Sequence, residues 1–76
     1  MRRSIECLIY RGERLYVAEC FDFPVVTQGA TLDEAVDNLH EAVALHLEGM
    51  NLGELGFAPS PRLDVRLEVG ERIGVS

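Results

Sequence analysis

The stretch "TQGATLDEAVDNLHEAV", residues 27–43, decides the fold because it takes the chain from a strand into a helix. Thr31 and Glu34 have the spacing of a capping box, in which both side chains accept hydrogen bonds from backbone N–H groups at the helix start. This pair predicts a helix that begins at Leu32. Gly29 lies at the exit of the strand, where we expect a positive φ that a side chain would strain. Gly29, Thr31 and Glu34 are therefore predicted to be structural residues.

The predicted helix runs from Leu32 to about Glu48 and ends near Gly49. With about 100° of rotation per residue, one side carries the stripe expected to face the core. This stripe consists of Leu32, Ala35, Val36, Leu39, Ala42, Val43, His46, Leu47 and Met50. The opposite side is acidic and carries no basic residue; it consists of Asp33, Glu34, Asp37, Glu41 and Glu48. Such a surface favours long-range attraction of a basic partner.

Two segments before this stretch, residues 4–11 and 14–21, alternate with the period of two that is typical of strands. Residues 12–13, Gly-Glu, predict a two-residue hairpin turn of type II′ between them. The resulting register places Glu6 directly opposite Glu19. The hairpin is therefore expected to bring two carboxylates together on one face.

The two faces of this hairpin differ in character. One is small and apolar, as required for packing under a helix, and consists of Ile5, Cys7, Ile9, Tyr16, Ala18 and Cys20. The other mixes apolar residues with acids and consists of Glu6, Leu8, Tyr10, Leu15, Val17, Glu19 and Phe21. Cys7 and Cys20 are expected on a diagonal of the first face, which disfavours a disulfide and favours two buried thiols.

The rest of the chain completes one small domain. Asp-Phe-Pro at residues 22–24 predicts a turn, and residues 25–28 predict a short third strand. The loop at residues 49–57 is expected to fold back onto the body or a neighbouring subunit, and residues 62–69 predict a fourth strand. The expectation is a single α+β domain over residues 1–76, with the order β-β-β-α-β. We expect an antiparallel meander with one helix packed on one face.

The composition narrows the function. Thirteen acidic residues against seven basic ones give a net charge of −6, which argues against direct binding to nucleic acid and fits a basic partner. No apolar run approaches the roughly 20 residues that span a bilayer, and the N-terminus lacks a signal-peptide core, so we expect a cytoplasmic protein without membrane contact. A chain this short buries only about 60% of its unfolded surface, and we therefore expect a homo-oligomer, a dimer or a tetramer.

Catalysis finds little support in the sequence. A metal-dependent nuclease needs several carboxylates around two magnesium ions, whereas Glu6 and Glu19 supply two. His40 and His46 do not have the spacing of a metal pair on one helix face, and Cys7 has no histidine placed to activate it. We expect no enzyme activity, no cofactor and no metal. A residual nuclease using Glu6 and Glu19 is the least favoured alternative.

What remains is a binding surface. Aromatic and apolar side chains set among acids are typical of the centre of a protein interface, and the second hairpin face has this mixture. Together with the acidic helix side it supplies the candidate partner-binding residues: Glu6, Tyr10, Leu15, Glu19, Phe21, Asp37, Glu41 and Glu48. We expect the acids to make electrostatic contacts, and Tyr10, Leu15 and Phe21 to act as anchors.

The segment "YVAECFDFP", residues 16–24, and the stretch "TQGATLDEAVDNLHEA", residues 27–42, resemble the HicB-like antitoxin family. The shared patterns are "y-v-A-e-c-p-d-l-P" and "s-q-G-d-T-l-e-E-A-l-e-n-l-k-E-A". The resemblance covers about residues 4–47. The chain departs from the pattern at residues 24–26, Pro-Val-Val, where the family often has Pro-Gly-Cys.

This resemblance implies a β-β-β-α-β fold like a truncated RNase H domain without its catalytic acids. It also implies a non-catalytic antitoxin that masks a small basic mRNA-cleaving toxin of the HicA type. Many family members carry a C-terminal DNA-binding segment, and we expect this chain, which ends at Ser76, to be a stand-alone domain without one. The alternative is an orphan oligomeric domain with a structural or small-ligand-binding role and no toxin partner.

Overall fold

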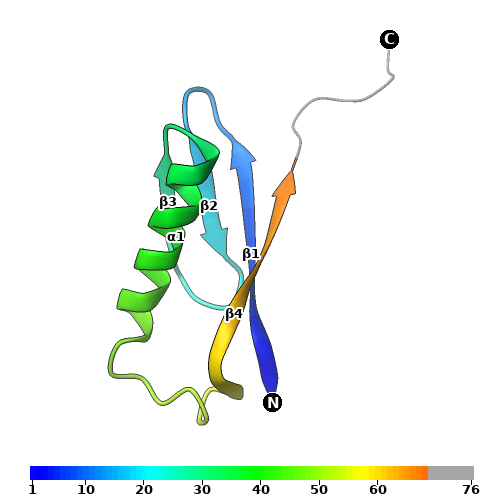
Figure 1. The fold of residues 1–76 in the computed structure, drawn as a ribbon, viewed down its shortest axis with the longest axis vertical. Coiled ribbons are helices and arrows are strands. Elements are labelled where there is room, and N and C mark those ends of the chain that lie inside the picture. The colour runs from blue at the N-terminus through cyan, green and yellow to red at the C-terminus, as the bar shows by residue number, and fades with distance from the viewer. Residues whose placement is uncertain (69–76) are drawn as a thin grey trace.

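A computed structural model describes residues 1–68, which form a four-stranded sheet and one helix (Figure 1). In chain order the elements are β1 (Arg2–Arg11), β2 (Tyr16–Cys20), β3 (Val26–Gly29), α1 (Leu32–Leu47) and β4 (Phe57–Glu68). The strand order in the sheet is β3-β2-β1-β4. The α+β class and the order β-β-β-α-β are confirmed. The first three strands form the antiparallel meander, whereas β4 pairs with β1 in parallel, so the sheet as a whole is mixed.

The parallel pairing follows from the path of the helix. α1 runs back along the sheet, and the chain therefore enters β4 at the end where β1 began. Regular pairing of β4 starts where Ser4 meets Arg62. The strand nevertheless begins earlier than predicted, because Phe57 already pairs with Arg2 and the residues between bulge out of the ladder. Val69, the expected end of this strand, lies outside the described residues.

The predicted turn between β1 and β2 is wrong by two residues. Arg11 pairs with Tyr16 and not with Arg14. The loop holds residues 12–15 and is closed by an N–H···O bond of 2.7 Å between its first and last residues. The shorter turn would oppose two arginines, whereas here the Arg11 guanidinium lies 5.1 Å from the Tyr16 ring centroid, a favourable cation–π contact. Because the shift is two residues, every strand side chain stays on its predicted face.

The same shift places Cys7 directly opposite Cys20, so the predicted diagonal arrangement is wrong. The Phe21 N–H donates to the Glu6 carbonyl at 2.9 Å, which makes the neighbouring cysteines a non-hydrogen-bonded pair, the kind with closer side chains. Both thiols are free and buried, as expected. The Cys7 thiol donates to the Ile5 carbonyl at 3.6 Å. Burial, reinforced by the neighbouring Cys20, raises the pKa of Cys7 to about 12.

The capping box at the start of α1 is confirmed. The Glu34 N–H donates to Thr31 Oγ1 at 3.1 Å, and the Ala30 N–H donates to Glu34 Oε1 at 2.8 Å. The helix begins at Leu32 as predicted. It ends at Leu47, close to the expected end, and Gly49 follows in the left-handed conformation with φ +81°.

The expected positive φ at Gly29 is wrong, because the described glycines with positive φ are Gly49 and Gly56. Gly29 is required for a different reason. A Cβ atom there would lie 2.5 Å from the backbone nitrogen of Ala35, closer than van der Waals contact allows. β3 and α1 therefore approach each other through the glycine backbone. The Asn38 side chain adds a 2.8 Å hydrogen bond to the Gln28 carbonyl across the same contact.

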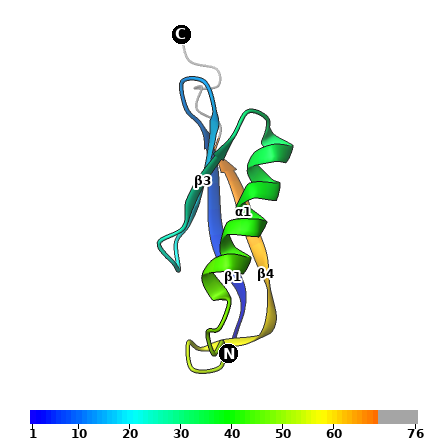
Figure 2. The ribbon, with the colours of Figure 1, turned by 90° about the vertical axis from the view of Figure 1, so that its left-hand side faces the viewer.

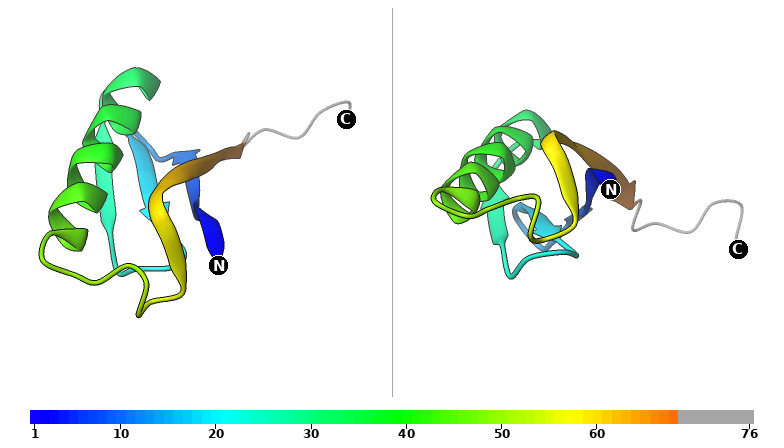
Figure 3. Two further views of the ribbon diagram at one scale, coloured as in Figure 1. Left: turned by 60° about the horizontal axis from the view of Figure 1, so that its bottom comes forward. Right: turned by 90° about the horizontal axis from the view of Figure 1, so that it is seen from below.

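The core lies between α1 and one face of the sheet, as the side view shows (Figure 2). It consists of Ile5, Cys7, Ile9, Ala18, Cys20, Val25, Ala35, Leu39, Val43 and Phe57. The loop after α1 folds back onto the body as predicted, since Phe57 is buried and its ring lies 5.7 Å from that of Phe23. The helix contacts β2 and β3 most extensively, and β4 forms the edge of the sheet opposite β3 (Figure 3).

Candidate binding face of the sheet

One face of the sheet is covered by α1, and no other element of the described residues 1–68 covers the opposite face (Figure 3). We call the uncovered surface of β1–β3 the outer face. Its apolar, aromatic and acidic residues are Glu6, Leu8, Tyr10, Val17, Glu19 and Val26, and the polar residues Ser4 and Gln28 also lie on it. Of the first six, Val26 is 67% exposed and the other five side chains are half-buried. The outer face thus presents apolar and aromatic area directly to its surroundings, with two carboxylates among it.

Tyr10 is held in place at one end of this face, opposite Val17. Its hydroxyl donates a 3.3 Å hydrogen bond to Glu19 Oε2 on the neighbouring strand. Partial burial and then the Glu19 carboxylate raise the pKa of Tyr10, so the phenol stays protonated and remains a donor at neutral pH. An aromatic ring fixed in this way loses little conformational freedom on binding, which is a property of interface anchors.

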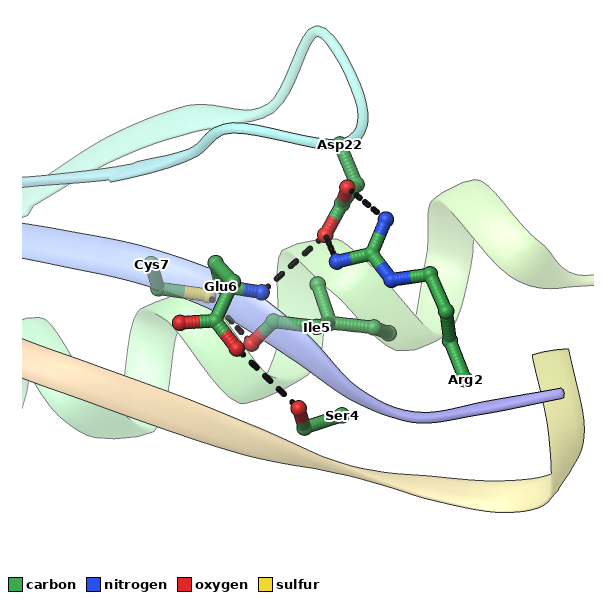
Figure 4. Close-up of polar contacts among 6 residues, drawn as sticks. All are labelled: Arg2, Ser4, Ile5, Glu6, Cys7 and Asp22. Carbon is green, nitrogen blue, oxygen red and sulfur yellow. Dashed lines mark hydrogen bonds and ion pairs between the residues drawn. The ribbon is translucent and has the colours of Figure 1, made fainter.

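Glu6 lies at the other end of the outer face. Ser4 Oγ donates to Glu6 Oε2 at 3.0 Å (Figure 4). In the parallel pairing, Glu6 is the direct neighbour of Asp64 on β4, which places two carboxylates side by side. Two like charges on adjacent strands are mutually destabilising and are better accommodated when a cation lies near them. Arg62 lies 3.3 Å from Asp64 and offsets one of the two charges, which leaves one net negative charge at this point.

An ion pair, not anticipated from the sequence, fixes the backbone beside Glu6. The Arg2 guanidinium donates to both carboxylate oxygens of Asp22, at 2.5 and 3.0 Å, and the Glu6 N–H donates to Asp22 Oδ2 at 3.0 Å (Figure 4). The Asp22 side chain thus accepts the hydrogen bond from the Glu6 N–H that a backbone carbonyl of the neighbouring strand would otherwise accept, at the point where β2 ends. The hydrogen bonds from Arg2 and Glu6 lower the pKa of Asp22. No local signal in the sequence links positions 2 and 22, because the residues are far apart along the chain.

The eight candidate binding residues do not form one surface. Glu6, Tyr10 and Glu19 lie on the outer face, and Phe21, 59% exposed, lies at its edge beside Glu6. Leu15 lies in the β1–β2 loop, so its predicted place opposite Tyr10 is taken by Val17. The remaining acids are exposed on the other side of the sheet, Asp37 and Glu41 on α1 and Glu48 at its C-cap. A small partner bound flat on the outer face would not touch them.

The predicted pairing of Glu6 with Glu19 is wrong, because Glu19 pairs with Leu8. The two carboxylates are offset by two residues, about 7 Å along the strand. Within residues 1–68, no group of three or more histidine, cysteine, aspartate or glutamate side chains is arranged to hold a metal ion. His46 is half-buried, and its ring centroid lies 5.2 Å from that of Phe23. It packs between the helix and the β2–β3 turn.

Comparison with family models, with curated proteins and with solved structures finds no match to this chain. Across the described part of the chain, α1 included, no helix has the length and apolar character needed to cross a membrane.

Proposed function

We propose that this protein is a non-catalytic binding protein whose outer face docks on a small basic protein, as an antitoxin docks on an RNA-cleaving toxin. The observation that supports this most is the composition of the uncovered face, where Leu8, Tyr10, Val17 and Val26 lie among Glu6 and Glu19. An apolar and aromatic centre with charged groups near it is the usual organisation of protein interfaces.

The charge of the outer face indicates that the partner is positively charged. A protein that cleaves RNA binds phosphates through arginine and lysine side chains. Carboxylates such as Glu6 and Glu19 can pair with those side chains, while Tyr10 and Val26 exclude water around the pairs. Docking then covers the RNA-binding surface of the partner, and inhibition needs no chemical step.

The acidic side of α1 has a separate role in this proposal. Asp37, Glu41 and Glu48 are exposed on the side of the molecule away from the outer face. They contribute to the net charge of −6 that speeds encounter with a basic protein, and they make no direct contact. Charge at this distance is largely screened once the ionic strength reaches about 0.15 M.

The test uses the small basic protein encoded by the reading frame next to the gene of this chain. We expect the two purified proteins to form a stable complex and the complex to leave RNA uncut under conditions in which the basic protein alone degrades it. Absence of such a reading frame, or a basic protein that neither binds nor is inhibited, would contradict the proposal. An oligomer that binds only itself would indicate an orphan structural domain.

A further inference from the structure

β4 leaves one edge of the sheet open over its regular segment, residues 62–68. Its partner strand β1 occupies one side, and β4 is the last strand in the order β3-β2-β1-β4. The backbone N–H and C=O groups on the outer side of this strand therefore have no strand partner among the described residues. An open strand of this length is a template for pairing with another strand. The edge at the opposite end, β3, offers only the four residues Val26–Gly29.

The side chains of this segment alternate strictly. One face carries charges of alternating sign: Arg62, Asp64, Arg66 and Glu68. The face toward α1 carries Leu63, Val65 and Leu67. We propose that two copies of the chain pair antiparallel along β4, with Val65 opposite Val65 of the second copy, to form one continuous sheet of eight strands, four from each copy.

The charge pattern selects this register. With Val65 at the twofold axis, Asp64 lies opposite Arg66 of the second copy and Arg62 lies opposite Glu68, so every charged pair has opposite signs. Sliding the pair by two residues in either direction brings like charges together, Asp64 on Asp64 or Arg66 on Arg66. A slip by one residue would move the apolar side chains to the charged face. Opposite charges across a strand pair are stabilising and like charges are destabilising, so a single register is favoured.

Pairing also relieves an unfavourable contact within each copy. Asp64 lies beside Glu6 in the parallel pairing with β1, and its one ion pair in the sheet is an exposed contact of 3.3 Å with Arg62. In the proposed register Arg66 of the second copy reaches the other side of Asp64. The carboxylates of Glu6 and Asp64 then have two arginines near them, Arg62 of the same copy and Arg66 of the second copy, whereas the single chain supplies only Arg62 in an ion pair.

The face toward α1 gains apolar contacts in the same arrangement. Leu67 is 48% exposed and Val65 is 38% exposed, because the helix lies over β2 and β3 and not over β4. Leu67 of the second copy lies opposite Leu63. A groove of about 370 Å³ opens beside Leu63, lined also by Val43 and Leu47 of the helix side, and the incoming leucine lies at its mouth. Exposed apolar area on both copies is therefore removed from water.

Mass measurement by light scattering with size-exclusion chromatography tests the dimer. We expect the wild-type chain to elute with twice its monomer mass of 8.4 kDa. Asp64→Arg alone and Arg66→Asp alone each create two like-charge pairs and should weaken dimerisation by about tenfold or more. The double variant Asp64→Arg/Arg66→Asp restores every pair and should dimerise like the wild type. Circular dichroism of each variant reports whether it folds.

A cysteine cross-link tests the register separately. Val65→Cys places a thiol directly opposite its own copy, so a short bis-maleimide cross-linker should join the two copies into a covalent dimer. Leu63→Cys faces Leu67 of the second copy instead and should stay monomeric on a non-reducing gel. The wild type, with its buried Cys7 and Cys20, is the control for background cross-linking.

A monomeric wild type at about 100 µM, or a dimer that neither charge variant weakens, would overturn the proposal. A dimer in which Leu63→Cys cross-links and Val65→Cys does not would overturn the register. None of these measurements involves binding at the outer face. They therefore test the β4 dimer independently of the proposed binding of a basic protein.

Discussion

At the scale of single residues, Gly29 determines how closely the helix approaches the sheet. It is the last residue of β3, just before α1. The first turn of the helix fills the space that a side chain would need, because Ala35 N lies 2.5 Å from the position that a Cβ atom would take. Its backbone conformation is one that other residues adopt, so the constraint is steric and not conformational. The helix angle, and with it the burial of Leu39, depends on this one missing side chain.

Gly29→Ala should therefore lower the free energy of unfolding by about 2 kcal/mol, as overpacking against backbone does. The matched control is Gly53→Ala, whose Cβ would meet only the flexible ends of the Asn51 and Met1 side chains at 3.3 and 3.8 Å. Urea unfolding followed by circular dichroism measures both. Equal stability of the two variants would contradict a close approach of α1 to the backbone of Gly29.

The ion pair of Arg2 with Asp22 predicts a pH dependence. The pKa of Asp22 is lowered from its usual 3.8 in the folded state, so its contribution is complete above that value and is lost as the pH falls through the folded-state pKa. Asp22→Asn keeps an acceptor for the Glu6 N–H and removes the charge. We expect this substitution to lower the free energy of unfolding by about 1 kcal/mol near neutral pH. This value already allows for solvent around the half-exposed Arg2, which weakens the ion pair.

The difference between wild type and Asp22→Asn should shrink in urea unfolding carried out below about pH 4. Asp37→Asn, on the exposed side of α1, serves as the control and should show little difference at either pH. A gap for Asp22→Asn that stays constant down to about pH 3 would mean that the carboxylate charge contributes nothing.

At the scale of elements, the alternating pattern of β1 correctly assigned its faces, because burial of every second residue depends only on parity. Ile5, Cys7 and Ile9 lie in the core as expected. The loop length was not predictable from that pattern, since registers two residues apart share the same faces and differ by contacts such as Arg11 on Tyr16. The parallel pairing of β4 with β1 could not be predicted either, because a local alternating pattern indicates a strand but not the strand with which it pairs.

The register correction has a chemical consequence for the two thiols. Cys7 lies opposite Cys20 in the core, and its pKa is raised to about 12, so almost no thiolate exists near neutral pH. Iodoacetamide should label the native protein at Cys7 much more slowly than the urea-unfolded protein, by a factor that follows the unfolding equilibrium. Mass spectrometry of digested samples distinguishes the two positions. Equal labelling rates in native and unfolded protein would contradict the burial of this thiol.

At the scale of the whole molecule, negative charge is distributed over two opposite sides, the outer face of the sheet and the exposed side of α1. The acids of both sides and Tyr10 could be predicted from the sequence, whereas the separation of these groups follows from packing of the helix on one face of the sheet. Only the outer face combines carboxylates with exposed apolar area such as Val26. In the proposed function the two sides therefore make different contributions to binding a basic protein: contact on one and long-range attraction on the other.

The most direct test of the outer face is calorimetric titration of the small basic protein that the proposed function requires. It is titrated at about 0.15 M salt into the wild-type chain and into two charge-reversal variants. Glu19→Arg reverses a charge beside Tyr10 and should weaken binding by about tenfold or more. Glu41→Arg makes the same reversal on α1 and should change the affinity by less than about threefold. Equal losses for the two variants, or a greater loss for Glu41→Arg, would contradict the assignment of the outer face as the binding surface.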